Sequence, residues 1–163
     1  MAIKEKLVQA INKQINAELY SSYLYLAMAA YFESNNWMGF AQWMKVQLRE
    51  ENTHAMKFYE YLVIRGGRVV LSAIDAPDRE WKSPLGVFEA VYAHEVKVTA
   101  MVNDLLKLAR DEQDTATEVM LQWFINEQVE EEANALLILE KLKMIKDSTN
   151  GLFMLDHKLG ERK

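Results

Sequence analysis

The chain has 163 residues, a net charge of −5 and no cysteine. This length suits a single domain, which we expect to span residues 1–163. The absence of cysteine excludes disulfides, Cys-ligated zinc, iron–sulfur clusters and thiol nucleophiles. The mild acidity disfavours nucleic acid as a partner, because phosphate binding needs clustered Lys and Arg. An acidic protein is better suited to attracting cations.

Half of the residues are apolar, yet the chain has only six Gly and two Pro. So few breakers over this length favour long helices over many short strands. The pattern predicts helices at residues 3–33, 37–65, 84–110 and 114–146, and a short fifth helix at 152–159. Turn residues separate them, and Pro84 suits the first turn of the third helix.

The sequence predicts neither a signal peptide nor a membrane span. Its first six residues, MAIKEK, carry charge where a signal peptide needs an apolar core. The longest nearly apolar stretch, 19–32, is interrupted by Ser21 and Ser22 and is shorter than the ~20 residues that a span needs. We therefore expect a soluble cytoplasmic protein that does not bind a membrane.

The lengths of the connections predict the topology. Short connections make the first and second helices antiparallel neighbours, and likewise the third and fourth. The connection at 66–83 is much longer and lacks a helical period. At up to ~3.3 Å per residue it can traverse the ~40 Å length of such a helix. The economical interpretation is a crossover that leaves the second and third helices parallel, as in a four-helix bundle with one long connection.

Each predicted helix has an apolar seam at helical spacing, and each seam contains a glutamate near its midpoint. Because the midpoints of similar helices meet at one level of a bundle, these carboxylates should converge on one buried spot. They are Glu18, Glu51, Glu95 and Glu131.

One seam glutamate could be a paired core acid, but four at one level repel each other. Two ionised carboxylates 4 Å apart cost ~4 kcal/mol even at an effective dielectric of 20. No Lys or Arg run lies on the seams to neutralise them. Two solutions remain, strongly raised pKa values or bound cations, and metal is the better hypothesis.

His54 follows Glu51 by three residues, so both side chains share a helix face and can bind one ion. A single helical histidine is more often structural, but beside four convergent carboxylates it resembles a ligand. Oxygen-rich coordination with one imidazole suits iron or manganese, and zinc would compete.

These residues resemble the non-haem ferritins of bacteria and archaea. The resemblance covers the whole chain, and three motifs carry it, at residues 16–22 (NAELYSS), 50–55 (EENTHA) and 126–132 (NEQVEEE). The terminal Gly151-Leu152-Phe153 also matches. The fold that it implies is an all-α, ferritin-like four-helix bundle with one long crossover and a short C-terminal fifth helix.

The resemblance also implies roles for individual residues. Glu18, Glu51 and His54 would hold a first iron, with Glu51 bridging to a second. Glu95 and Glu131 would complete the second site, which Gln128 would line. A third iron, on the side facing a storage cavity, would be bound by three further acids. These are Glu50, Glu127 and Glu130.

Two aromatic residues match family positions near the centre. Tyr25 would be an electron or hydrogen donor beside the two irons, although simple core packing explains it equally well. For Trp123 we expect core packing.

The resemblance implies an iron-storing ferroxidase. Two Fe(II) ions would be oxidised by dioxygen or peroxide, and Fe(III) mineral would be deposited inside a hollow cage of twenty-four copies with octahedral symmetry. No haem is expected, since Asn52 stands where a bacterioferritin has its haem-ligating methionine. The fourth helix has Gln128-x-x-Glu131 in place of a second Glu-x-x-His pair, which also disfavours rubrerythrin-like centres.

Two alternatives stay open. One is a ferritin-like di-iron enzyme that reduces peroxide or oxidises an organic substrate without storing iron; cage formation would argue against it. The other is a structural bundle whose glutamates are protonated, although that would leave four convergent carboxylates without a purpose.

Overall fold

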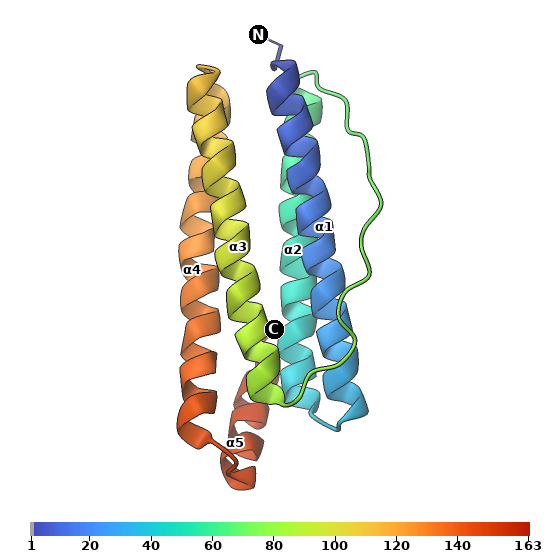
Figure 1. Ribbon diagram of the computed structural model, residues 1–163, viewed down its shortest axis with the longest axis vertical. Coiled ribbons are helices and arrows are strands. Elements are labelled where there is room, and N and C mark those ends of the chain that lie inside the picture. Colours follow the sequence, from blue (N-terminus) through green and yellow to red (C-terminus); the bar gives the residue numbers. More distant parts are fainter. Residues whose placement is uncertain (1) are drawn as a thin grey trace.

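The computed structural model describes residues 2–163, which form five α-helices and no strand. The first four run side by side along the molecule, and the fifth turns back at one end (Figure 1). The predicted all-α bundle with a short C-terminal helix is confirmed. The helices are α1 (Glu5–Ser34), α2 (Met38–Ile64), α3 (Pro84–Asp111), α4 (Thr115–Ile145) and α5 (Thr149–Gly160).

The helices pack in two antiparallel pairs, α1 with α2 and α3 with α4, while α5 packs mainly against α2. Between the pairs, residues 65–83 return along the whole bundle, so α2 and α3 run in the same direction (Figure 1). None of the helices within residues 2–163 is both long and apolar enough to cross a bilayer.

Two asparagines on α1 hold the crossover in place. The Asn12 side chain donates to the Arg68 carbonyl at 2.9 Å and accepts from the Val70 amide at 2.8 Å. One turn later, the Asn16 amide donates to the Ala73 carbonyl at 3.1 Å. A long segment without secondary structure needs such partners, because its backbone groups have none of their own.

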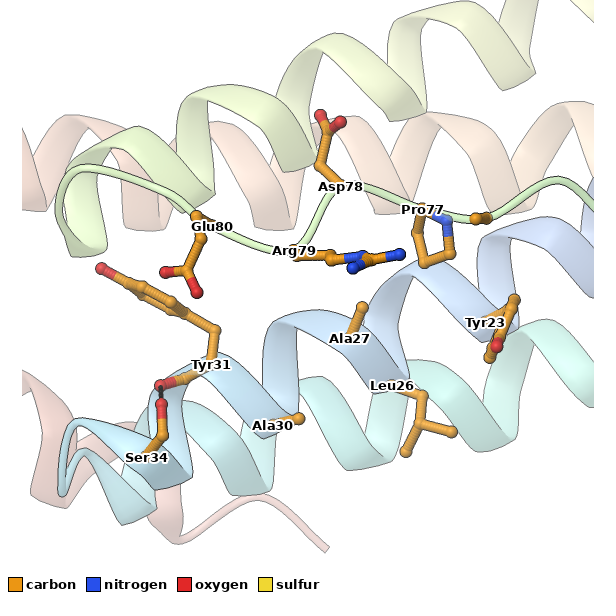
Figure 2. Close-up of a pocket in the computed structure, with 11 residues that line it drawn as sticks. Tyr23, Leu26, Ala27, Ala30, Tyr31, Ser34, Pro77, Asp78, Arg79 and Glu80 are labelled. Atoms are coloured by element: carbon orange, nitrogen blue, oxygen red, sulfur yellow. Dashed lines mark hydrogen bonds between the residues drawn. The ribbon is translucent and has the colours of Figure 1, made fainter.

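Further along, the crossover and the outer face of α1 enclose a cleft of about 440 Å³. In Figure 2, Pro77 and Arg79 of the crossover lie above Ala27 of α1, and Glu80 faces Tyr31. None of the candidate metal ligands lines this cleft.

The fifth helix begins three residues earlier than the predicted start at 152. The Ser148 hydroxyl accepts from the Gly151 amide at 3.2 Å and so caps a helix that starts at Thr149. Asn150 and Gly151, which precede the predicted start, therefore lie within the first turn of this helix. N-capping by serine supplies a partner to an otherwise unpaired first-turn amide.

Two glycines let α5 dock closely on α2. A Cβ on Gly39 would meet the Asp156 carbonyl oxygen at 1.7 Å, and one on Gly160 would lie 3.2 Å from the Gly39 Cα. In addition, the Phe40 amide donates to Asp156 Oδ1 at 2.9 Å. The backbones of the two helices therefore touch, which only residues without a side chain permit.

The buried apolar residues form two clusters, one toward each end of the bundle. On α1, the clusters are separated by residues 16–23, and on α3 by residues 92–97. This gap is the level at which the seam glutamates lie. A polar layer therefore crosses an otherwise apolar core.

Candidate metal centre

The four seam glutamates are almost fully buried, with exposures of 1% for Glu18, 2% for Glu51, 1% for Glu95 and 5% for Glu131. Each comes from a different helix of the bundle. His54, Gln128 and Tyr25 are buried in the same layer. The seams therefore bring these side chains together as the helical periodicity indicated.

One group of ligand atoms combines Glu18, Glu51 and His54, whose atoms lie within 4.8 Å of one another. His54 Nδ1 lies 3.2 Å from Glu51 Oε2, as expected for side chains three residues apart on a helix. Glu18 Oε2 is buried and has no hydrogen-bond partner among residues 2–163. A buried carboxylate oxygen without a partner is costly, and a bound cation would satisfy it.

A second group combines His54, Glu127 and Glu131, again within 4.8 Å. His54 Nε2 faces Glu127 Oε1 at 3.7 Å. The two nitrogens of the ring therefore face two different carboxylates, Glu51 on one side and Glu127 on the other. If Nδ1 binds a metal ion, Nε2 carries the proton and faces a carboxylate, the usual arrangement that orients a ligating histidine.

Glu95 belongs to neither group. Its two oxygens instead accept hydrogen bonds, one from the Tyr25 hydroxyl and one from Gln128 Nε2 at 3.2 Å. Tyr25 thus contacts a candidate ligand directly, which core packing alone does not require. Gln128 therefore lies directly beside Glu95.

The three acids expected to bind a third iron, Glu50, Glu127 and Glu130, lie at one rim of this layer. Glu127 is partly buried, Glu130 is exposed, and the side chain of Glu50 is 39% exposed. Glu50 and Glu127 line one pocket together with His54, whereas Glu130 does not. Glu50 forms an ion pair with Arg162, a contact that the sequence did not indicate.

The expectation that Trp123 packs in the core is wrong. Trp123 is 38% exposed and lines the same pocket as Glu50 and His54. Its ring meets the His54 ring edge-on at a centroid distance of 5.5 Å, and the Lys57 ammonium lies 4.0 Å above it. The residue faces outward because Phe124, the next residue, takes the core position of that turn.

Two buried glutamines that sequence reasoning missed position the carboxylates. Gln14 Nε2 donates to Glu18 Oε1 at 2.7 Å, and Gln47 Nε2 donates to Glu131 Oε2 at 2.9 Å. Both amides are buried. Gln14 lies one helical turn before Glu18, and that spacing is the signal that could have identified it. Gln47 contacts Glu131 of another helix, and spacing within one helix does not indicate such a contact.

Burial raises the pKa values of the central carboxyls. The pKa of Glu18 rises to about 7, although the hydrogen bond from Gln14 acts in the opposite direction. Burial and the charge of Glu95 raise the pKa of Glu131 to about 8. Burial also raises the pKa of Glu95, and together with the charge of Glu18 it raises the pKa of Glu51 well above its ordinary value.

His54 shifts in the other direction. Burial, followed by the charge of Lys57, lowers the pKa of His54 to about 4. The ring is therefore neutral at physiological pH, the form in which imidazole binds metal. A neutral imidazole cannot compensate the carboxylates, so the layer either keeps protons or needs cations.

Because a charged Glu131 is unfavourable in the buried layer, we expect Glu131→Gln to stabilise the metal-free protein at alkaline pH. The Glu131 pKa is about 8 in the folded state and 4.5 as its ordinary value. The folded state thus holds more protons between these values, and its stability falls as pH rises through this window. We expect a gain on the order of 2 kcal/mol at pH 8.5, or roughly 4–8 °C in Tm, and almost none at pH 4.5.

The measurement is thermal unfolding in the presence of a chelator, with exposed Glu60→Gln as the control. The range from pH 6.5 to 8.5 is the informative one. His54 contributes with the opposite sign, because its lowered pKa makes stability rise with pH between about 4 and 6.5. A Tm difference that does not change with pH would show that Glu131 is not protonated in the folded state.

Comparison with known proteins agrees with this geometry. The family model described as "Ferritin-like domain" matches residues 8–145. A bacterial non-heme ferritin from Bacteroides fragilis is 46% identical over 160 residues, which cover 98% of this chain and 99% of that protein. The chain belongs to the prokaryotic non-haem ferritins.

Solved ferritin structures show the same fold. An open-pore ferritin from the hyperthermophilic archaeon Archaeoglobus fulgidus superposes with a TM-score of 0.99 at 52% identity, covering 99% of this chain and 100% of the other. A closed form of that ferritin, engineered by site-directed mutagenesis, gives the same score and identity, covering 99% of both chains. The predicted family membership is confirmed.

Proposed function

We propose that this ferritin is a ferroxidase that oxidises Fe(II) at its buried carboxylate layer and stores the Fe(III). The observation that carries the proposal is the group Glu18, Glu51 and His54, whose ligand atoms lie within 4.8 Å of one another in a layer that also contains Glu95 and Glu131. Carboxylate oxygen with one imidazole is a donor set that suits iron.

In this proposal Glu18, Glu51 and His54 bind the first Fe(II), and Glu51 also reaches the second. Glu95 and Glu131 complete the second site, beside Gln128. Gln14 and Gln47 orient Glu18 and Glu131 through the hydrogen bonds described above. Such outer partners fix ligand geometry and typically affect metal affinity 10–100-fold.

Iron is the substrate in this reaction, and each Fe(II) gives one electron to dioxygen or peroxide. The protein holds two ions close enough to react together in a dry, shaped site. In this proposal Tyr25 supplies a further electron and proton, and its hydrogen bond to Glu95 supports that role. Carboxyls with raised pKa values exchange their protons for incoming metal, so iron uptake releases protons.

Storage requires an enclosure, and we propose a cage of twenty-four copies in octahedral arrangement. Family membership supports an oligomer of this kind. Large apolar side chains that are exposed in the single chain also support an oligomer, because contacts with neighbouring subunits would bury them. On α1 and at the end of α2 these include Tyr23, Leu26, Val63 and Ile64.

The proposal has three further parts. We infer that Glu50, Glu127 and Glu130 bind a third iron on its way to the cavity, because Glu127 shares a ligand group with His54 and Glu131. No haem is proposed, since Asn52 is an exposed amide. We also propose that residues 1–163 form one domain and that the protein is cytoplasmic.

Stepwise aerobic addition of Fe(II) tests storage directly. The metal-free protein should already elute as a particle of about twenty-four subunits in a size-exclusion experiment with light scattering. After addition of many more than two Fe(II) per subunit, the ferric iron should co-elute with that particle. Rapid oxidation without retained iron would favour a di-iron oxidase instead, and a monomer or dimer would rule out storage in a cage.

A further inference from the structure

The segment that follows α5 lies beside the candidate third iron site. Figure 1 marks the C end part-way along the bundle, well away from the end at which α5 begins. There the Arg162 carbonyl accepts from Gln42 Nε2 of α2 at 3.0 Å. This contact uses the backbone of Arg162, so it does not depend on which side chain residue 162 carries.

The Arg162 side chain contacts two residues of α2. One terminal nitrogen, Nη2, lies 2.6 Å from Glu50 Oε2, and the guanidinium lies 4.7 Å from the centre of the Trp43 ring. The other terminal nitrogen, Nη1, is buried and has no hydrogen-bond partner among residues 2–163. The ion pair is therefore single rather than bidentate, and a single contact is the weaker form of an Arg–carboxylate pair.

Glu50 also faces the other acids of the rim. The lining of a pocket of about 320 Å³ includes Glu50, His54, Glu127 and Lys163. The negative charge of Glu50 contributes to raising the pKa of Glu127, after burial and Glu130. Arg162 acts on the same layer with the opposite sign, since its charge lowers the pKa of Glu131.

We propose that Arg162 is a built-in competitor for the third metal site: its guanidinium occupies Glu50, and a metal ion binds there only by displacing it. This inference rests on the proposed function. Arg162 then determines how readily an ion moves from the two central sites to the third site at Glu50. A carboxylate oxygen that accepts from a guanidinium has less negative charge available for a cation, so the third ion is held weakly while Arg162 is in place.

The test is zinc binding to the metal-free cage, because Zn(II) binds the same donors and undergoes no oxidation. Isothermal titration calorimetry of wild type should show two tight ions per subunit and a weaker third. In Arg162→Ala the third ion should bind about tenfold more tightly, equivalent to about 1.4 kcal/mol, while the first two remain. Arg162→Lys retains the charge and should behave like wild type.

A second pair of variants separates competition from a structural role. Glu50→Ala should weaken the third ion, and adding Arg162→Ala to it should bring no further gain, since no carboxylate is left to release. Zinc anomalous scattering from crystals of Arg162→Ala should locate the third ion at Glu50 and Glu127.

The outcomes are distinguishable. If the third ion binds equally in wild type and Arg162→Ala while two tight ions persist, the competition is overturned and the proposed di-metal centre stands. An equal gain from Arg162→Ala with and without Glu50 would also overturn it. Loss of the two tight ions from wild type itself would overturn the proposed function, and this inference with it.

Discussion

Glu51→Ala is expected to slow oxidation of the first two Fe(II) per subunit about a hundredfold or more. Glu51 lies beside both Glu18 and His54, and in the proposal it is the one residue that contacts both ions. Loss even of an outer partner of a metal ligand costs 10–100-fold, so loss of a shared ligand should cost at least the upper end of that range. Stopped-flow absorbance of the ferric product measures the rate.

Two further variants show whether a slower rate is due to loss of the carboxylate. Glu51→Gln keeps the volume of the side chain but removes its charge, so it should be as slow as Glu51→Ala without leaving a cavity. Glu60→Ala, exposed on the same helix, should retain the wild-type rate. Rapid oxidation in Glu51→Gln would show that the carboxylate layer is not where the iron reacts.

Gly39→Ala is expected to release α5 from the bundle. A Cβ at this position would lie 1.7 Å from the Asp156 carbonyl oxygen, and backbone cannot swing aside as a side chain can. Overpacking of this kind costs about 1–3 kcal/mol, and opening of α5 relieves it. Hydrogen exchange of the α5 amides should therefore accelerate roughly tenfold or more, while the centres of α1 to α4 keep their protection.

Gly86→Ala is the matched control, since its Cβ would meet only the Ser83 hydroxyl at 3.6 Å. Gly86 lies in the first turn of α3, and alanine at this position should leave the hydrogen-exchange protection of all five helices unchanged. Unchanged protection of α5 in Gly39→Ala would mean that the two helices have room to separate slightly without opening.

The helices and the level of the carboxylates could be read from the sequence. A 3-4 apolar spacing determines which face of a helix is buried, and the distance of Glu18, Glu51, Glu95 and Glu131 from the helix ends determines their height. The crossover could be predicted as well, because a segment of that length between two helices can reach the far end of the bundle. The apolar spacing, the position of a residue along its helix and the length of a connection are all properties of one segment of the chain, so the sequence of that segment is enough to predict them.

The partners of those residues were decided only by tertiary structure. Sequence spacing placed Glu95 in the carboxylate layer, and only the folded chain shows that its oxygens accept hydrogen bonds from Tyr25 and Gln128. Likewise, nothing in the sequence brings Arg162 to Glu50, 112 positions away. A helix fixes neighbours three and four residues apart, whereas contacts between helices depend on how each one is rotated and docked, and α5 docks where two glycines let backbones touch.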